Sequence, residues 1–172
     1  MATRQVRVVA AASWCCVIAG CGSSPTSEPT APVSREVFHS ADCNAVTDAD
    51  LTRVVGPGLF ARVVVNDAGC FWQENSVLDG FGIGMGISTW WYRGSDLDTE
   101  RSLEQNAGRT LTEVTVNGNK GFKAYDDNAC SVYVTKGNDV ITWSVQSVNP
   151  DALPDLCSIT DRLAQLSQNR VN

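Results

Sequence analysis

The sequence has little of the residue types on which catalytic and metal sites depend. It holds a single histidine, His39, and none of its seven cysteines stands in a CxxC pair. A lone imidazole with no thiol or hydroxyl motif beside it gives no basis for a nucleophile and base pair, and zinc or thioredoxin-type centres are disfavoured. We therefore predict no catalytic residue, no metal and no cofactor, with His39 a bystander. A hydrolase is the weakest alternative.

Motifs that bind phosphate or calcium are also lacking. The glycines at positions 82, 84 and 86 alternate within an apolar run and do not form a GxGxxG or GxxxxGK[ST] loop. Of two acidic pairs, Asp126 with Asp127 and Asp48 with Asp50, the first lacks the oxygen-rich spacing of an EF-hand loop. We interpret the first pair as turn residues and the second as helix-capping residues.

Basic residues are fewer than acidic ones, 13 Lys and Arg against 19 Asp and Glu, for a net charge of −6. An acidic chain is repelled by phosphate polyanions and by anionic lipid surfaces. Nucleic-acid binding and electrostatic membrane binding are therefore disfavoured, and any membrane attachment has to come from an anchor.

No apolar run reaches the length of about twenty residues that a transmembrane helix needs. The run at residues 8–18 follows Arg4 and Arg7 and precedes the small residues Ala19 and Gly20. A basic start, a short apolar core and small residues at its end are typical of a signal peptide. Residues 1–20 are thus predicted to be removed, which takes away two arginines and brings the net charge to about −8.

Cys21 differs from Cys15 and Cys16 because small residues precede it, in the order Ile18-Ala19-Gly20-Cys21. This pattern resembles the lipobox of bacterial lipoproteins. The resemblance implies that Cys21 receives a diacylglycerol on its sulfur, becomes the new N-terminus and is acylated, for example with palmitate, on its nitrogen. Two or more acyl chains are what stable anchoring requires. The alternative is an ordinary signal peptide with a chance cysteine.

The chain after Cys21 divides by composition into a linker and a domain. Residues 22–35 are rich in Ser, Thr, Pro, Gly and Ala, which is typical of a flexible tether. We favour a solvated spacer over an O-glycosylated one. Residues 21–35 are thus the lipidated cysteine and linker, and residues 36–172 are predicted to form a single globular domain.

Local patterns in this domain predict helices and strands in alternation. Three helices are expected. The first starts at Thr47 and stops at Gly56-Pro57, and the second spans Ser95–Ala107, with only Leu97, Leu103 and Ala107 to bury. The third, at the end of the chain, is indicated by the helical spacing of Leu156, Ile159, Leu163 and Leu166. Expected strands are 61–65, 70–74, 81–93, 110–116, 120–125, 130–135 and 140–147, most of them joined by tight turns such as Asn117-Gly118.

This order predicts an α+β fold, an antiparallel β-sheet of about six to seven strands with three helices packed on it. It resembles the Mog1/PsbP-like shape. The four cysteines outside the leader predict two disulfides, with three possible pairings. Cys70 and Cys130 both begin strands, whereas Cys43 and Cys157 stand at helices, so we favour Cys70–Cys130 and Cys43–Cys157 over the alternatives.

The expected strand from residue 81 to residue 93 alternates strictly between two faces. One face is large and apolar, and the other is a strip of glycines that ends in aromatic residues. We favour a helix of the same domain lying on this strip, and a ligand groove or partner patch is the alternative. The candidate face for an apolar or glycan ligand, or for an envelope protein partner, comprises Gly82, Gly84, Gly86, Trp90, Tyr92 and Arg93.

Several motifs resemble mycobacterial lipoproteins of the LprB and LprC type. They are Gly69-Cys70-Phe71-Trp72, the run 91–95 with Glu100-Arg101 after it, and the late cysteines Cys130 and Cys157. The resemblance extends over most of the chain and implies an actinobacterial domain of unknown function without known catalytic residues. It implies a lipid-anchored envelope protein on the extracytoplasmic face of the cell membrane. We predict that its domain binds a ligand or a protein partner without catalysing a reaction.

Overall fold

The protein is represented by a computed structural model that describes residues 42–56, 60–74, 84–152 and 155–171. These residues belong to one compact unit, Val37–Asn172. Its elements, in chain order, are η1 (Asp42–Ala45), α1 (Asp48–Val55), β1 (Phe60–Asn66), β2 (Gly69–Glu74), β3 (Met85–Tyr92), α2 (Leu97–Asn106), β4 (Thr110–Val116), β5 (Asn119–Tyr125), β6 (Ala129–Lys136), β7 (Asp139–Ser147), η3 (Pro150–Ala152) and α3 (Leu156–Arg170).

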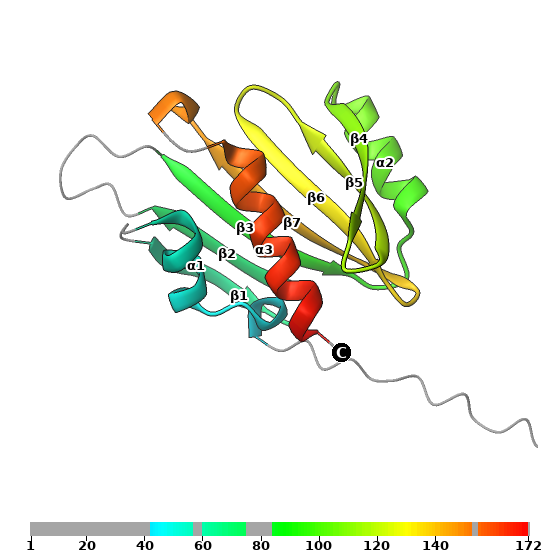
Figure 1. Cartoon of the computed structure of the whole chain (residues 1–172), viewed down its shortest axis with the longest axis horizontal. Helices are drawn as coiled ribbons and strands as arrows, with labels where there is room; N and C mark the ends of the chain where they lie inside the picture. Colours follow the sequence, from blue (N-terminus) through cyan, green and yellow to red (C-terminus); the bar gives the residue numbers. More distant parts are fainter. Residues whose placement is uncertain (1–41, 57–59, 75–83, 153–154, 172) are drawn as a thin grey trace, which may run out of the picture. The chain divides into compact units, whose positions relative to one another are not determined.

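The seven strands form one antiparallel sheet in the order β1-β2-β3-β7-β6-β5-β4 (Figure 1). Three hairpins, β1–β2, β4–β5 and β6–β7, match the predicted ones. In the β4–β5 turn, Asn117 and Gly118 have φ values of 49° and 82°, which a tight antiparallel hairpin requires. The centre of the sheet comes from long-range pairing of β3 with β7, which no local turn specifies.

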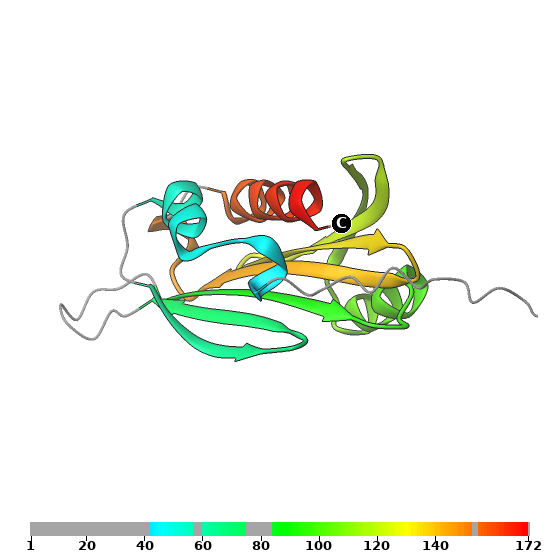
Figure 2. The same ribbon diagram turned by 90° about the horizontal axis from the view of Figure 1, so that it is seen from below.

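Helices cover the two faces of the sheet unequally. α1 and α3 lie on one face, and α2 lies on the opposite face next to β4, β5 and β6 (Figure 2). The main core fills the space under α3, where Trp72 and Trp143 stack with ring centroids 6.0 Å apart and Leu163 is fully buried. The predicted α+β sheet with three helices is confirmed, while the Mog1/PsbP-like shape stays a prediction.

α1 begins as its sequence predicts. Thr47 is the N-cap, and it forms a capping box in which its hydroxyl accepts from the Asp50 backbone N–H while the Asp50 carboxylate accepts from the Thr47 backbone N–H. The Asp50 side chain is only 5% exposed, and it also binds Arg170 of α3 at 2.6 Å and Arg53 at 2.9 Å. Asp50 therefore links the first helix to the last.

Replacing Asp50 with alanine is expected to lower the free energy of unfolding by about 2–3 kcal/mol, because a buried carboxylate loses charged hydrogen bonds to Arg170 and Arg53. The control is Asp98→Ala in the first turn of α2. Asp98 is exposed, so the loss should stay below about 1 kcal/mol. Chemical denaturation of the purified variants measures both values, and equal losses would contradict the proposed role of Asp50.

The same carboxylate predicts the acid sensitivity of the fold. The hydrogen bond from Arg170, followed by that from Thr47, holds the pKa of Asp50 well below its usual range. A lowered folded-state pKa contributes stability that is present above the unfolded value of about 4 and is lost as the pH falls below it. Denaturation midpoints measured from about pH 6 down to about pH 3 should therefore fall less steeply for Asp50→Ala than for the wild type.

Two disulfides are present, but the favoured pairing was wrong. Cys43 bonds Cys70 and Cys130 bonds Cys157. The strands β2 and β6, which carry Cys70 and Cys130, are separated in the sheet by β3 and β7. Three strand spacings amount to roughly 14 Å, far beyond the Cα separation that a disulfide spans. Each strand cysteine instead reaches the element that lies on it, η1 above β2 and α3 above β6.

α2 packs differently from its predicted apolar face. Leu97 is partly buried, but Leu103 is 59% exposed and Ala107 is also exposed. The helix turns Glu100 and Glu104 toward the domain instead, where Ser95 donates a hydrogen bond to Glu100 and Arg109 binds Glu104. Since these partners satisfy the carboxylates, polar contacts compensate for the burial of the charges.

Candidate partner-binding face

The face opposite α3 is the candidate site, since no helix of the described residues covers its part over β2, β3 and the adjoining end of β7 (Figure 2). Strand alternation points alternate residues of β2, β3 and β7 to this side. We name six neighbouring ones the open face: Phe71, Gly86, Ser88, Trp90, Ser144 and Gln146. Most are half-buried, Gln146 is exposed and none is charged.

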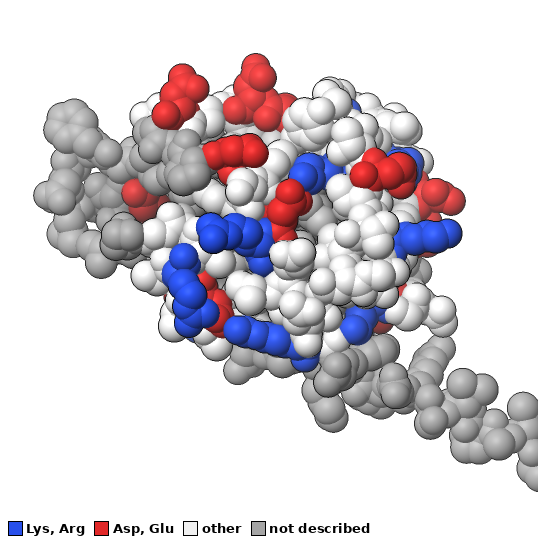
Figure 3. Space-filling model, in the orientation of Figure 1, with Lys and Arg blue, Asp and Glu red and all other residues white. Residues whose placement is uncertain are grey.

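Charge is distributed differently on the other side of the domain. On the face covered by α3, acidic side chains gather toward the top of the view and basic ones toward the lower left (Figure 3). The core of a protein–protein interface is depleted of charge and enriched in aromatic residues. The open face, with Phe71 and Trp90, has that composition.

Gly86, the glycine of the strip that lies within β3, is covered by side chains of the two neighbouring strands. A Cβ atom added at Gly86 would lie 3.1 Å from the Phe71 ring and 3.0 Å from the amide nitrogen of Gln146. The favoured interpretation, a helix lying on the strip, is therefore wrong at Gly86. Gly84 lies just before β3, and Gly82 lies outside the described residues.

The residues at the aromatic end of β3 lie in three different environments. Trp91 is buried in the core under α3, and its indole N–H donates to Asp139 at 2.8 Å. Trp90 is half-buried on the open face, beside Thr142 of β7. Tyr92 packs in the small cluster beside α2, and Arg93 donates at 3.4 Å to the Asp67 carbonyl in the β1–β2 turn. The structure thus brings Gly86 and Trp90 onto one face and places Tyr92 and Arg93 at its margin.

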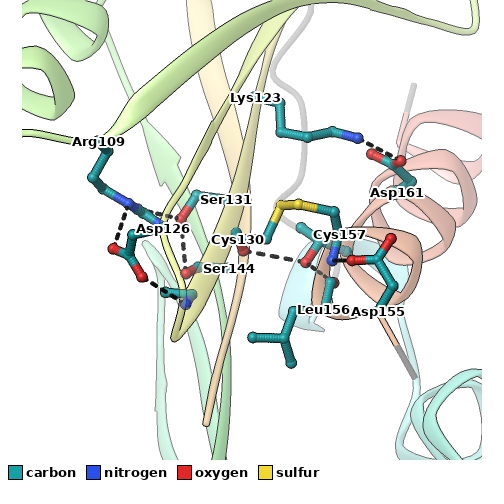
Figure 4. The surroundings of a disulfide bond; sticks show 12 residues. Arg109, Lys123, Asp126, Cys130, Ser131, Ser144, Asp155, Leu156, Cys157 and Asp161 are labelled. Atoms are coloured by element: carbon teal, nitrogen blue, oxygen red, sulfur yellow. Dashed lines mark hydrogen bonds and ion pairs between the residues drawn. A yellow bond between two sulfur atoms is a disulfide. The ribbon is translucent and has the colours of Figure 1, made fainter. Parts of the chain in front are cut away.

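A polar network borders the open face at Ser144. The Ser131 hydroxyl donates to Ser144 at 2.9 Å, and Arg109 donates to Ser131 at 3.0 Å. Arg109 also pairs with Glu104 at 3.1 Å and with Asp126 at 3.3 Å. Figure 4 shows Arg109, Asp126, Ser131 and Ser144 on one side of β6 and the Cys130–Cys157 disulfide on the other. Arg109, held by its ion pairs with Glu104 and Asp126, thus positions the Ser131 hydroxyl, and Ser131 in turn positions the Ser144 hydroxyl.

Two tyrosines beside this network remain neutral. Tyr133 donates its hydroxyl to Glu104, and burial together with this hydrogen bond raises the pKa of Tyr133. Burial also raises the pKa of Tyr92, with a smaller effect from Glu100 and Glu104. At neutral pH both phenols therefore keep their protons, Tyr133 as a hydrogen-bond donor to Glu104 and Tyr92 as a packing residue of the cluster beside α2.

The side of the sheet that carries the open face has a hollow at one end. A hollow of about 630 Å³ is lined by Gly84, Asp126, Asn128, Ala129, Gln146, Ser147 and Val148. Gln146 is shared with the open face, so the hollow extends that surface toward the start of β3. Asp126 helps to shape the hollow by accepting from the backbone N–H groups of Asn128 and Ala129.

The remaining candidate residues take structural positions or fall outside the described ranges. His39 and Cys21 both lie outside them. Asp48 and Asp50 stand in the first turn of α1, and Asp126 stands in a turn, as predicted. Within the described residues, no group of three or more His, Cys, Asp or Glu side chains could hold a metal ion. In the same part of the chain, no helix is long and apolar enough to cross a membrane.

Sequence reasoning missed part of this face. Phe71, Ser144 and Gln146 come from β2 and β7, and only the strand order brings them beside β3. Ser88 carried a usable signal, because it has the same parity as Gly86 and Trp90 in one strand. For Phe71, Ser144 and Gln146, no local sequence pattern indicated that their strands, β2 and β7, lie on either side of β3.

Comparison with known proteins agrees with the sequence motifs. A protein from Mycobacterium bovis named "Putative lipoprotein LprB" is 32% identical over 168 residues, which are 87% of this chain and 86% of the relative. The protein of the same name from Mycobacterium leprae is 32% identical over 168 residues, 88% of this chain and 85% of the relative. No solved structure matches the chain. The predicted resemblance to lipoproteins of this type is confirmed. The model of the family described as "Protein of unknown function (DUF3558)" matches residues 16–170, and the chain belongs to that family.

Proposed function

We propose that this protein is a lipid-anchored lipoprotein on the extracytoplasmic face of the cell membrane, whose domain binds a protein partner through the open face without catalysing a reaction. The single observation that carries the binding role is the uncharged, partly aromatic sheet face at Phe71, Gly86 and Trp90, on which no helix of the described residues packs.

The anchor rests on the sequence before the domain. Ile18-Ala19-Gly20-Cys21 resembles a lipobox, and relatives over most of the chain are named as lipoproteins. Lipid on Cys21, with the signal peptide of residues 1–20 removed, leaves the linker as a tether that holds the domain off the membrane. An acidic domain held this way is free to present its uncharged surface to a partner.

The shape of the surface favours a protein partner. The side chains of Phe71 and Trp90 lie on a sheet and are half-buried, so they offer a broad surface that is already ordered. Rigid aromatic side chains bind at a low entropic cost and dominate the energy of many interfaces. The polar margin at Ser144 and Gln146 is suited to the hydrogen bonds of an interface rim.

A glycan is the second candidate, favoured by a different observation. The exposed amide of Gln146 and the carboxylate of Asp126 meet at the hollow, while the Trp90 indole lies on the same side of the sheet. Amide and carboxylate groups hydrogen-bond sugar hydroxyls, and an aromatic ring packs on the apolar side of a sugar.

A photoreactive residue at position 73 tests the proposal. Gln73 is exposed and pairs with Gly86, so benzoylphenylalanine there should form an adduct with a bound partner in the native membrane. Adding Trp90→Ala should reduce the adduct roughly tenfold or more, because loss of an aromatic hot spot costs about 2 kcal/mol or more. Mass spectrometry of the adduct distinguishes a polypeptide from a glycan.

The matched control places the same photoreactive group at Gln165, an exposed residue of α3 on the other side of the sheet. An adduct of equal yield from positions 73 and 165 would contradict a binding role for the open face. Circular dichroism of the Trp90→Ala variant verifies that a lost adduct reflects lost contact and not unfolding.

A further inference from the structure

The edge strand β1 exposes three consecutive valines. Val63, Val64 and Val65 have exposed fractions of 52%, 38% and 55%, and they form the one run of adjacent large apolar residues exposed in the described ranges. β1 is the first strand of the sheet order, so no other strand of the described residues pairs with its outer edge. Single exposed apolar residues are ordinary, but a contiguous run on a sheet edge marks an interaction site.

The two edges of the sheet differ in how they are protected. The opposite edge, β4, carries Glu113 at its centre, 74% exposed and paired with Arg101 at 2.6 Å. A charge at mid-strand is a common device against edge-to-edge pairing. The only charged residue of β1 is Arg62, whose guanidinium binds Asp48 at 2.7 Å and lies 6.0 Å from the centre of the Trp72 ring. The charge is thus held against the domain's own residues.

We propose that β1 pairs antiparallel with β1 of a second copy of this chain, joining two seven-stranded sheets into one across a two-fold axis at Val64. The pairing is a strand addition, in which backbone groups left unpaired at the edge bond to each other. Val64 lies beside Phe71 of the open face, but the pairing uses backbone groups of the sheet edge and does not depend on what the open face binds.

The sequence of β1 is complementary to itself in this register. With Val64 opposite Val64 of the partner, Val63 meets Val65 in both copies and the apolar residues of each strand face apolar residues. Arg62 then stands opposite Asn66 of the partner, and the exposed Asp67 follows Asn66 directly. No like charges face each other in this register, and Arg62 of each copy comes close to Asp67 of the other at the two ends of the paired strands. Cross-strand pairs of β-branched residues are favourable in antiparallel sheets.

This complementarity favours a second copy over the strand of another protein. A β-bulge interrupts β1 between Arg62 and Val64, which bends the strand and limits the partners that fit it. With the axis at Val64, the bulge of each copy faces Val65 of the other, and the two-fold symmetry makes the two halves of the interface identical. Lipid anchoring, where present, would raise the local concentration of copies and promote the same contact.

The register makes Val64→Cys a direct test in the full-length protein in its native membranes. Cα atoms opposite each other in an antiparallel pair lie about 4.5–5.5 Å apart, which a disulfide spans. Under mild oxidation, V64C should give at least tenfold more covalent dimer on a non-reducing gel than Thr115→Cys, an exposed position on β4. Peptide mapping should identify the bond between the two introduced cysteines.

A second variant keeps the test decisive if the added cysteine disturbs folding. Val64→Lys places two like charges against each other on the axis, so the full-length protein in detergent should change from dimer to monomer by light scattering, with an unchanged circular dichroism spectrum. Equal dimer yields from V64C and T115C, a monomeric wild type, or cross-linking of V64C to a different protein would each overturn the proposal.

Discussion

Replacing Cys21 with alanine is expected to abolish incorporation of radioactive palmitate and to release the protein from the membrane fraction. Each buried methylene of an acyl chain contributes roughly 0.8 kcal/mol to membrane binding, and stable anchoring takes two chains. Without the Cys21 sulfur no diacylglycerol can attach, and residues 8–18 are too short to replace it as a transmembrane helix. The expected change is from nearly all of the protein membrane-bound to nearly all of it soluble.

Cys15→Ala and Cys16→Ala are the matched controls. Both residues lie in the predicted signal peptide, so both variants should remain labelled and membrane-bound. Palmitate labelling and fractionation in a mycobacterial host report the two outcomes separately. Label that persists in Cys21→Ala would disprove the lipobox, and loss of label in Cys16→Ala would move the acylation site.

The elements predicted correctly are those that a local pattern specifies. Thr47 with Asp50 predicted the start of α1, and Asn117-Gly118 predicted the β4–β5 hairpin. Each signal lies within a few residues of the structure it forms, because a cap or a tight turn is closed by its own backbone. The alternation of β3 was predicted for the same reason, as strand geometry itself sets the two faces.

The errors concern contacts between residues far apart in the chain. α2 turned Glu104 inward because Arg109 and Tyr133 meet it there, and Tyr133 stands 29 residues away. Gly86 is covered by Phe71 and Gln146 because β2 and β7 flank β3, a strand order that tight turns do not define. The candidate site was therefore predicted only in the residues that β3 itself supplies.

The disulfides illustrate the same limit most clearly. All four cysteines were predicted to be paired, and both bonds are present. Cys70 and Cys130 were placed correctly in strands, but nothing local indicated that two strands lie between them. Once the sheet order is known, the observed pairing follows, because the side chains of Cys70 and Cys130 both point to the face on which η1 and α3 lie. Each bond therefore ties a flanking element to the sheet.

Removing the Cys130–Cys157 bond with the double variant Cys130→Ser/Cys157→Ser is expected to lower the free energy of unfolding by roughly 3.5 kcal/mol, the chain-entropy value for a loop of about 27 residues. That is a large part of the 5–15 kcal/mol typical of a whole domain. The bond joins α3 to β6, where the Thr160 hydroxyl also donates to the Cys130 carbonyl at 3.2 Å, so the loss should loosen the last helix first.

The matched comparison is Cys43→Ser/Cys70→Ser, which opens a loop of the same sequence separation, 27 residues. Equal loops predict equal entropic losses, so the two double variants should unfold at similar denaturant concentrations if chain entropy dominates. Hydrogen exchange separates them, since protection should fall first in α3 for one variant and in η1 and β2 for the other.

Crossed variants give the sharpest check. Cys70→Ser/Cys130→Ser breaks both native bonds and leaves Cys43 and Cys157 without native partners, so it should be less stable than either matched pair. If it instead matched a single lost bond and non-reducing peptide mapping found Cys43 joined to Cys157, the pairing described for this fold would be disproved.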